Sequence, residues 1–305
     1  METQEFNSLV QEKTEELEQI IRKYLPKEDG LQKTVLQAMN YSVLAGGKRL
    51  RPMLMFETYR MCGGKGSEIE PFLAAIEMIH TYSLVHDDLP AMDNDEYRRG
   101  RETTWKVYGE TIGILAGDGL LNLAFETAFR AFELVDRSDP AALRRIADAL
   151  SVLGKKAGVF GMIGGQTADV EAEGRETPMT EDELLFIHRH KTAALIQASL
   201  TIGAILAGAD EEQIKVLEKC GEDVGIAFQI QDDVLDVVGD SKELGKPVGS
   251  DEQNCKQTYV TLKGLEQARA DVAALSGEAV SLLKTFGGEK DFLEQLILTL
   301  IHRSK

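Results

Sequence analysis

The chain has 305 residues, and its apolar content of 43% is enough to build a substantial hydrophobic core. Its net charge of -17 at pH 7 argues against nucleic acids and anionic membranes as partners, because that field repels polyanions unless a local basic patch overrides it. Cys62, Cys220 and Cys255 form no CxxC pair, so we expect no disulfide framework, no zinc site and a cytoplasmic location.

Helical periodicity dominates the chain, and no two β-branched runs flank an Asn-Gly or Asp-Gly turn. The pattern predicts helices over residues 4–24, 31–44, 51–62, 68–88, 109–134, 140–159, 181–207, 211–237, 257–284 and 290–302. No linker rich in Pro, Gly and Ser separates them, so we expect an all-α bundle of about ten or more long helices with residues 1–305 as a single domain. The most apolar stretch, 192–209, contains polar side chains and is expected to be a buried helix and not a membrane span.

Three polar residues mark predicted helix starts. Ser67 with Glu70 and Thr180 with Glu183 fit capping boxes, in which each side chain bonds a backbone N–H of the first turn. Asp139 precedes a proline, which fits an N-cap followed by proline at the first helical position.

The apolar stripe of the helix at 68–88 becomes polar at its C-terminal end. Phe72, Ile76, His80, Ser83 and Asp87 are spaced by three or four residues, so they lie on one helical face. Carboxylates on a core-facing stripe are costly unless a cation meets them. The helix at 211–237 shows the same pattern.

In the sequence DDVLD, Asp232, Asp233 and Asp236 follow Gln229 on a second core-facing stripe. Asp232 and Asp236 are one helical turn apart, so both can reach a single ion or its water shell. Carboxylates with room for water suit Mg²⁺, which shares its coordination with phosphate oxygens, whereas Zn²⁺ would favour His and Cys.

In the sequence DDLPAMD, Asp87 and Asp93 are six residues apart, which separates them by roughly 120° on an ideal helix. An interruption of the helix near Pro90 would return the third carboxylate to the side of the first. The two aspartate clusters, which we define as residues 87–93 and 232–236, together predict one magnesium site for an organic diphosphate.

Basic residues at four places could bind the remaining phosphate oxygens. They occur in GGKRLRP, RRG, HRHKT and GKPVGSD, and include Lys48, Arg49, Arg51, Arg98, Arg99, Lys191 and Lys246, with Thr192 beside Lys191. Arginine binds phosphate through two parallel hydrogen bonds, and glycine-flanked helix starts also bind it. Two basic sets around one metal site suggest two anionic substrates, of which only one is bound through metal.

Seven ordered motifs give the chain a strong resemblance to the trans-isoprenyl diphosphate synthases, especially the bacterial farnesyl diphosphate synthases. The motifs are GGKRLRP, HTYSLVHDDLPAMDNDEYRRG, ILAGDGLL, GMIGGQTADVEAEG, HKTAAL, FQIQDDVLDVVGD and GKPVGSD, and they span nearly the whole chain. The resemblance implies a helical bundle around a central cavity and a homodimer. It also implies condensation of isopentenyl diphosphate with dimethylallyl or geranyl diphosphate to give farnesyl diphosphate.

The resemblance further implies a role for each matching residue. Isopentenyl diphosphate would be held by Lys48, Arg51, His80 and Arg99. The allylic diphosphate would be held through three Mg²⁺ ions, or Mn²⁺ in their place, by Asp87, Asp88, Asp93, Asp232, Asp233 and Asp236, assisted by Arg98, Lys191 and Lys246. Thr192 and Gln229 would face the allylic carbon, and Tyr82 with Ser83 would limit product length.

Three alternatives remain open at this stage. A geranylgeranyl or geranyl diphosphate synthase would share the same motifs and differ at the residues that limit product length. A non-catalytic subunit that regulates a prenyl synthase should have lost one aspartate cluster or its basic counterparts, which this chain retains. A terpene cyclase should carry Asn, Ser and Glu in its second metal motif, where this chain has DDVLD.

Overall fold

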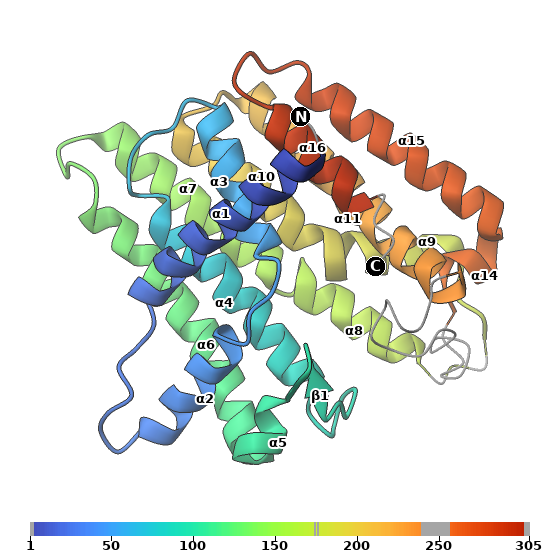
Figure 1. Ribbon diagram of the computed structural model, residues 1–305, viewed down its shortest axis with the longest axis horizontal. Helices are drawn as coiled ribbons and strands as arrows, with labels where there is room; N and C mark the ends of the chain where they lie inside the picture. Colours follow the sequence, from blue (N-terminus) through green and yellow to red (C-terminus); the bar gives the residue numbers. More distant parts are fainter. Residues whose placement is uncertain (1–2, 174, 176, 239–256, 302–305) are drawn as a thin grey trace. The chain divides into compact units, whose positions relative to one another are not determined.

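The computed structural model describes residues 3–173, 175, 177–238 and 257–301, and these residues are almost entirely helical (Figure 1). They separate into two compact units, one formed by Met1–Phe56 with Lys65–Leu150 and the other by Glu57–Gly64 with Ser151–Lys305. The all-α prediction is confirmed. A single domain over residues 1–305 stays a prediction.

The first unit is built around the long helices α4 and α6, which pack along each other (Figure 1). Its elements are α1 (Thr3–Lys23), α2 (Lys33–Val43), the first part of α3 (Leu50–Met61), α4 (Glu70–Asp87), β1 (Tyr97–Arg98), β2 (Arg101–Glu102), α5 (Thr104–Tyr108), α6 (Glu110–Phe129), a 3-10 turn (Arg130–Glu133) and most of α7 (Pro140–Ala157). Phe72, Ile76 and Ile79 of α4 are fully buried and form the centre of this core.

The second unit is built around α10 and α11, which pack against each other and against the helices that follow. Its elements are α8 (Met162–Ala172), α9 (Glu181–Ile187), a π-helical segment (His188–Ala193), α10 (Ala194–Ala207), α11 (Glu211–Val238), α14 (Tyr259–Lys263), α15 (Leu265–Leu283) and α16 (Asp291–Ile301). Helix α10 is buried along its length because nearly all of its residues are apolar.

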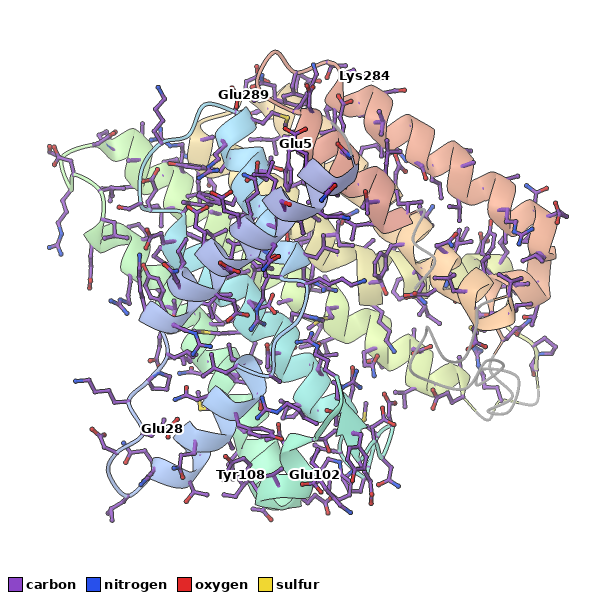
Figure 2. All side chains as sticks on the ribbon, in the orientation of Figure 1. Glu5, Glu28, Glu102, Tyr108, Lys284 and Glu289 are labelled. Carbon is purple, nitrogen blue, oxygen red and sulfur yellow. The ribbon has the colours of Figure 1, made fainter. Side chains whose placement is uncertain are left out.

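The two-stranded ribbon β1–β2 was not predicted. Its strands are only two residues long and antiparallel, which is too short for a hydrophobic alternation to reveal. The Tyr41 hydroxyl donates to the Glu102 carbonyl at 2.7 Å, and the Tyr41 ring packs edge-on against Tyr108 at 5.7 Å. Glu102 and Tyr108 mark this end of the first unit in Figure 2. These contacts fix the ribbon beside α2.

Two of the predicted helix starts are confirmed. Thr180 and Glu183 form a complete capping box, and the Asp139 carboxylate accepts the backbone N–H groups of the first turn of α7. The predicted capping box at Ser67 is wrong, because α4 begins at Glu70 and its N-cap residue, Ile69, makes no side-chain hydrogen bond. Ser67 instead accepts the Glu70 amide through its backbone carbonyl in the preceding turn.

Helix α8 was missed, and two predicted helices are divided. Gly164 and Gly165 lower the helix propensity of α8 in isolation, and packing overrides that preference. The predicted helix 181–207 contains the π-helical segment, and the predicted helix 257–284 breaks at Gly264, whose φ of 81° only glycine adopts readily.

One described segment, Glu110–Glu133, is long and apolar enough to cross a membrane, and 39% of its most apolar 18-residue window is buried in the fold. This is weak support for a membrane span, because core helices of globular proteins meet the same criteria. The predicted absence of a membrane partner stays a prediction.

Candidate active site

The first aspartate cluster closes on itself directly after α4. Asp87 is the last residue of the helix, and the backbone N–H of Asp93 donates to the Asp87 carbonyl at 2.8 Å. Asn94 donates to the Leu89 carbonyl at 3.1 Å and adopts a left-handed conformation. The predicted interruption near Pro90 is therefore confirmed, and a straight helix through residue 93 is excluded.

Asp88 differs from the other carboxylates of this cluster. Asp87 is half-buried and Asp93 is exposed, whereas Asp88 is only 3% exposed. The Arg98 Nε donates to Asp88 at 2.6 Å. Burial nevertheless raises the pKa of Asp88 to about 6, because the loss of hydration outweighs the attraction of Arg98. Arg98 and Asp88 thus form a pair within the first unit, which leaves Asp87 and Asp93 more accessible to a ligand.

The basic residues predicted for isopentenyl diphosphate gather around His80. Burial lowers the pKa of His80 well below its usual value, and the positive charges of Arg51, Arg99, Arg49 and Arg98 lower it further. His80 is therefore neutral at pH 7 and can offer a hydrogen bond but no charge. The arginines form a local basic patch in a chain whose net charge is -17.

Arg51 and Arg99 are both poised for an anion. Burial lowers the pKa of Arg51 to about 10, and its Nε has no hydrogen-bond partner among the residues the structure describes. Arg99 donates to the Gly46 carbonyl and lies against Gly47, which has no side chain to obstruct it. Lys48 is exposed between these glycines and α3. A buried donor without a partner is unfavourable unless a ligand completes its hydrogen bonding.

Backbone strain is concentrated in this part of the chain. Among the described residues, the non-glycine residues with positive φ are Arg49, Asn94 and Arg99. Arg49 lies in the loop between α2 and α3, Asn94 in the turn that follows α4, and Arg99 in the turn between β1 and β2. Such conformations are unfavourable for residues with a Cβ, and they persist where surrounding contacts enforce them, often at functional sites.

The second aspartate cluster lies on α11 in the other unit. A cavity of about 250 Å³ is bordered there by Asp169, Lys191, Thr192, Gln229, Asp232 and Asp236. Asp233 is only 6% exposed, and it accepts the backbone N–H of Tyr259 at 2.7 Å and the Gln229 amide at 3.4 Å. As in the first cluster, the second aspartate of the DD pair makes bonds within its own unit.

The π-helical segment His188–Ala193 positions two predicted residues at this cavity. The Lys191 ammonium donates to Asp169 at 2.5 Å, and the Thr192 hydroxyl donates to Gln229 at 2.8 Å. π-Helical turns are rare and are found mostly at functional sites. Asp169 was not assigned a role from the sequence, although an aspartate three residues after Gln166 in a segment of small residues could have drawn attention to it. Lys246 lies outside the described residues.

Gly165 provides the space that this segment requires. A Cβ at Gly165 would overlap the backbone nitrogen of Lys191 and lie 2.6 Å from the carbonyl carbon of His190. We expect Gly165→Ala to lower the free energy of unfolding by about 1–3 kcal/mol, because backbone atoms cannot move aside cheaply. Thermal unfolding followed by circular dichroism measures this.

Gly277→Ala is the matched control, because Gly277 lies within helix α15 and a Cβ there would contact nothing within 4 Å. That substitution should be neutral or stabilising, since alanine favours a helix more than glycine does. Equal melting temperatures for the two variants would contradict the steric account of Gly165.

The residues predicted to limit product length lie one turn before the first cluster. Tyr82 is 5% exposed, and its ring packs edge-on against His86 at 5.9 Å. Burial and the nearby Asp87 raise the pKa of Tyr82 to about 12, so its hydroxyl stays protonated. Ser83 is half-buried and donates to the His80 carbonyl at 2.9 Å.

Each aspartate cluster by itself suits Mg²⁺ better than a softer ion. Both offer carboxylate oxygens, and neither contains cysteine. Within the described residues, no three His, Cys, Asp or Glu side chains meet closely enough to enclose an ion by themselves.

The polyprenyl synthetase family profile matches residues 32–289. The chain belongs to this family. It is 45% identical over 263 residues to the farnesyl diphosphate synthase of Geobacillus stearothermophilus, and the match covers 86% of each chain. The predicted family resemblance is therefore confirmed.

Solved structures of polyprenyl synthetases support the same conclusion. The geranylgeranyl pyrophosphate synthetase from Pyrococcus horikoshii superimposes with a TM-score of 0.86 at 32% identity, covering 98% of this chain and 99% of that one. A geranyltransferase from Helicobacter pylori, complexed with magnesium and isoprenyl diphosphate, gives a TM-score of 0.80 at 33% identity, covering 96% and 95%. The all-α isoprenoid synthase fold is thereby established for this chain.

Proposed function

We propose that this polyprenyl synthetase condenses isopentenyl diphosphate with dimethylallyl or geranyl diphosphate to form farnesyl diphosphate. The observation that carries the proposal is the basic patch of Arg51, Arg99 and neutral His80, which lies in the same unit as the turn holding Asp87 and Asp93. The basic patch could bind one diphosphate without metal, and the carboxylates could bind another through metal. This arrangement fits two diphosphate substrates that are bound in different ways. Relatives named as farnesyl diphosphate synthases support this reading.

In this proposal the two aspartate clusters share one allylic diphosphate. All six aspartates of the clusters would hold it through Mg²⁺, and Asp88 and Asp233 are in addition bonded to Arg98 and Gln229. When bound, Mg²⁺ supplies positive charge that stabilises the leaving diphosphate. Three ions, and Mn²⁺ as a substitute, remain part of the proposal. The magnesium in the Helicobacter pylori geranyltransferase supports the choice of metal.

The protein's own groups then orient the reacting carbons. Arg98 and Lys191, together with Lys246, would bind oxygens of the leaving diphosphate. Thr192 and Gln229 are already joined by a hydrogen bond, and their oxygens would face the positive charge that develops on the allylic carbon. The double bond of isopentenyl diphosphate attacks that carbon and a proton is lost, so no nucleophilic side chain is required.

Product analysis tests this function directly. The purified protein is incubated with isopentenyl and dimethylallyl diphosphates, with and without Mg²⁺, and the products are dephosphorylated and separated by chromatography. Farnesol is the expected alcohol, and it should be absent without Mg²⁺. A geranylgeraniol or geraniol peak would support the alternative product lengths, and the Pyrococcus horikoshii synthetase gives the longer one some support. Absence of any condensation would favour a non-catalytic regulatory subunit.

A homodimer is the second part of the proposal, with α6 as its contact surface. Ile114, Leu115 and Phe129 on this helix are between 43% and 56% exposed, so three large apolar side chains of α6 are open to solvent. We expect Leu115→Lys to convert the dimer to a monomer, because a buried unpaired ammonium is strongly unfavourable in an interface. Size-exclusion chromatography with light scattering measures the mass.

Leu31→Lys is the control for the homodimer, because Leu31 is fully exposed before α2. It should remain dimeric. A wild-type protein that is monomeric at micromolar concentration would contradict the homodimer itself. A cytoplasmic location and the absence of nucleic acid as a partner remain predictions.

A further inference from the structure

The loop between α2 and α3 carries the basic residues that face the proposed isopentenyl diphosphate. Gly46 and Gly47 have φ values of 81° and 135°, and Arg49 has a φ of 45°. Glycine adopts these conformations freely, whereas arginine does so only under constraint. Lys48 stands between the glycines and Arg49, and Arg51 follows within the first turn of α3. The backbone conformation at Arg49 therefore determines the directions of the Lys48 and Arg51 side chains.

Arg49 itself turns away from solvent into the core of the first unit. It is 2% exposed, and its guanidinium donates to three acceptors on three helices. Nε donates to Glu18 of α1 at 2.5 Å, Nη1 to Glu77 of α4 at 2.6 Å, and Nη2 to the carbonyl of Val43 at the end of α2 at 2.6 Å. These bonds tie the loop to α1, α2 and α4 together.

The planar fork of arginine is required for this arrangement. Its donors diverge in fixed directions and can serve three acceptors at once, whereas the compact ammonium of lysine cannot span the same geometry. The pairing also compensates the charge of Glu77, which is 2% exposed and lies three residues before His80. Without Arg49, that buried carboxylate would lose its hydrogen-bonded ion-pair partner and keep only the charge attraction of Arg51 and Arg99.

The same loop also orients a residue from the RRG turn. Arg99 donates to the Gly46 carbonyl, and a side chain at Gly47 would obstruct its guanidinium. A displacement of the loop would therefore disturb Lys48, Arg51 and Arg99 simultaneously. These are three of the four side chains proposed to hold isopentenyl diphosphate.

We propose that Arg49 is a positioning residue for isopentenyl diphosphate, because its bonds to Glu18, Glu77 and the Val43 carbonyl hold the basic loop in its binding conformation. This rests on the proposed function. Arg49 touches no substrate, since its donors are directed to protein acceptors. Its effect should therefore fall on one substrate and leave the other largely unaffected, as the allylic diphosphate is assigned to other residues.

Steady-state kinetics of Arg49→Lys and Glu77→Gln test the proposal. Isopentenyl diphosphate is varied at saturating geranyl diphosphate, and then the reverse. Both variants should raise KM for isopentenyl diphosphate about tenfold or more while KM for geranyl diphosphate changes less than about twofold. Circular dichroism and thermal unfolding at the assay temperature verify that each variant is folded.

Lys23→Gln is the matched control, because Lys23 also pairs α1 with α4, through Glu70 at 3.1 Å, but does not contact the loop. It should keep both KM values. The double variant Arg49→Met with Glu77→Met removes both buried charges, so it should be folded at least as stably as Arg49→Met while retaining the raised KM. A KM for isopentenyl diphosphate that stays raised in this variant reflects the lost positioning of the loop, because the unpaired charge of Glu77 is no longer present.

Three results would overturn the proposal while leaving the proposed function intact. They are an unchanged KM for isopentenyl diphosphate in folded Arg49→Lys, an equal rise in both KM values, and recovery of the wild-type KM in the double variant. Failure of the wild-type protein to condense the two substrates would instead overturn the proposed function. In that case, calorimetric binding of isopentenyl diphosphate to wild type and Arg49→Lys still tests Arg49, and equal affinities count against it.

Discussion

Replacing Asp87 with asparagine is expected to lower kcat/KM by roughly 10²–10³-fold, because it removes a charge that we propose acts on the leaving diphosphate through metal. Asparagine preserves the shape of the side chain, so α4 and the turn after it should fold as before. The structural reason for choosing Asp87 is the 2.8 Å bond from the Asp93 amide to the Asp87 carbonyl, which holds both residues in one turn. The loss should fall mainly on turnover.

A titration with Mg²⁺ distinguishes a ligand from a structural residue. If Asp87 acts through the ion, the variant should need a higher Mg²⁺ concentration for half-maximal activity, whereas a folding defect would not shift that concentration. Glu96→Gln is the matched control, since Glu96 is an exposed carboxylate on the same segment and pairs with Lys106 at 2.7 Å. Activity of Asp87→Asn within about threefold of wild type would count against the proposed metal site.

The parallel between the two clusters refines the role of their second aspartates. Asp88 bonds to Arg98, and Asp233 bonds to the Tyr259 amide at the start of α14. Each is buried and each makes its bonds within its own unit. Since Asp88 is less exposed than Asp87 and Asp93, we propose that it contributes least to metal binding in the first cluster, whereas Asp233 and Asp236 are 6% and 8% exposed and burial does not distinguish them.

The sequence predicts this site well where chemistry and helical spacing decide the outcome. The interruption near Pro90 followed from the six-residue separation of Asp87 and Asp93 and from the inability of proline to continue a helix. The grouping of Arg51, Arg99 and His80 was implied by the family resemblance. Long helices such as α4 and α11 were predicted within a few residues, because their apolar stripes are continuous.

The features that could not be predicted depend on packing between segments distant in sequence. The π-helical segment around Lys191 lies against Gly165 of α8, and neither position carries a local signal for that contact. Helix propensity argued against α8 because of its glycines, whereas close packing is the reason that a glycine stands there. The buried bonds of Arg49 were equally hidden, since a basic residue among glycines suggests a ligand-binding side chain and not a core residue.

Replacing Tyr82 with methionine is expected to lengthen the major product by one isoprene unit. The chain growing from the first aspartate cluster is proposed to run along α4 toward its N-terminal part, and Tyr82 stands one turn before Asp87 with its ring fixed against His86. The His86 ring in turn contacts the Ile114 carbonyl of α6 at 3.1 Å. Because His86 is held in this way, the Tyr82 ring that packs against it cannot move freely. Methionine is unbranched and flexible, which allows an apolar chain to pass.

Tyr24→Met serves as the control for Tyr82→Met, because it makes the same change at a distant tyrosine. Tyr24 packs under the Arg130 guanidinium at 4.8 Å, just beyond the C-terminal end of α6. Arg130 stands sixteen positions after Ile114 along this helix, which corresponds to roughly 24 Å at the rise of an α-helix. Chromatography of the dephosphorylated products should show the longer alcohol for Tyr82→Met alone. An unchanged product distribution would mean that another residue limits the chain, and a shift in both variants would mean that looser packing of the unit, and not the Tyr82 ring, controls product length.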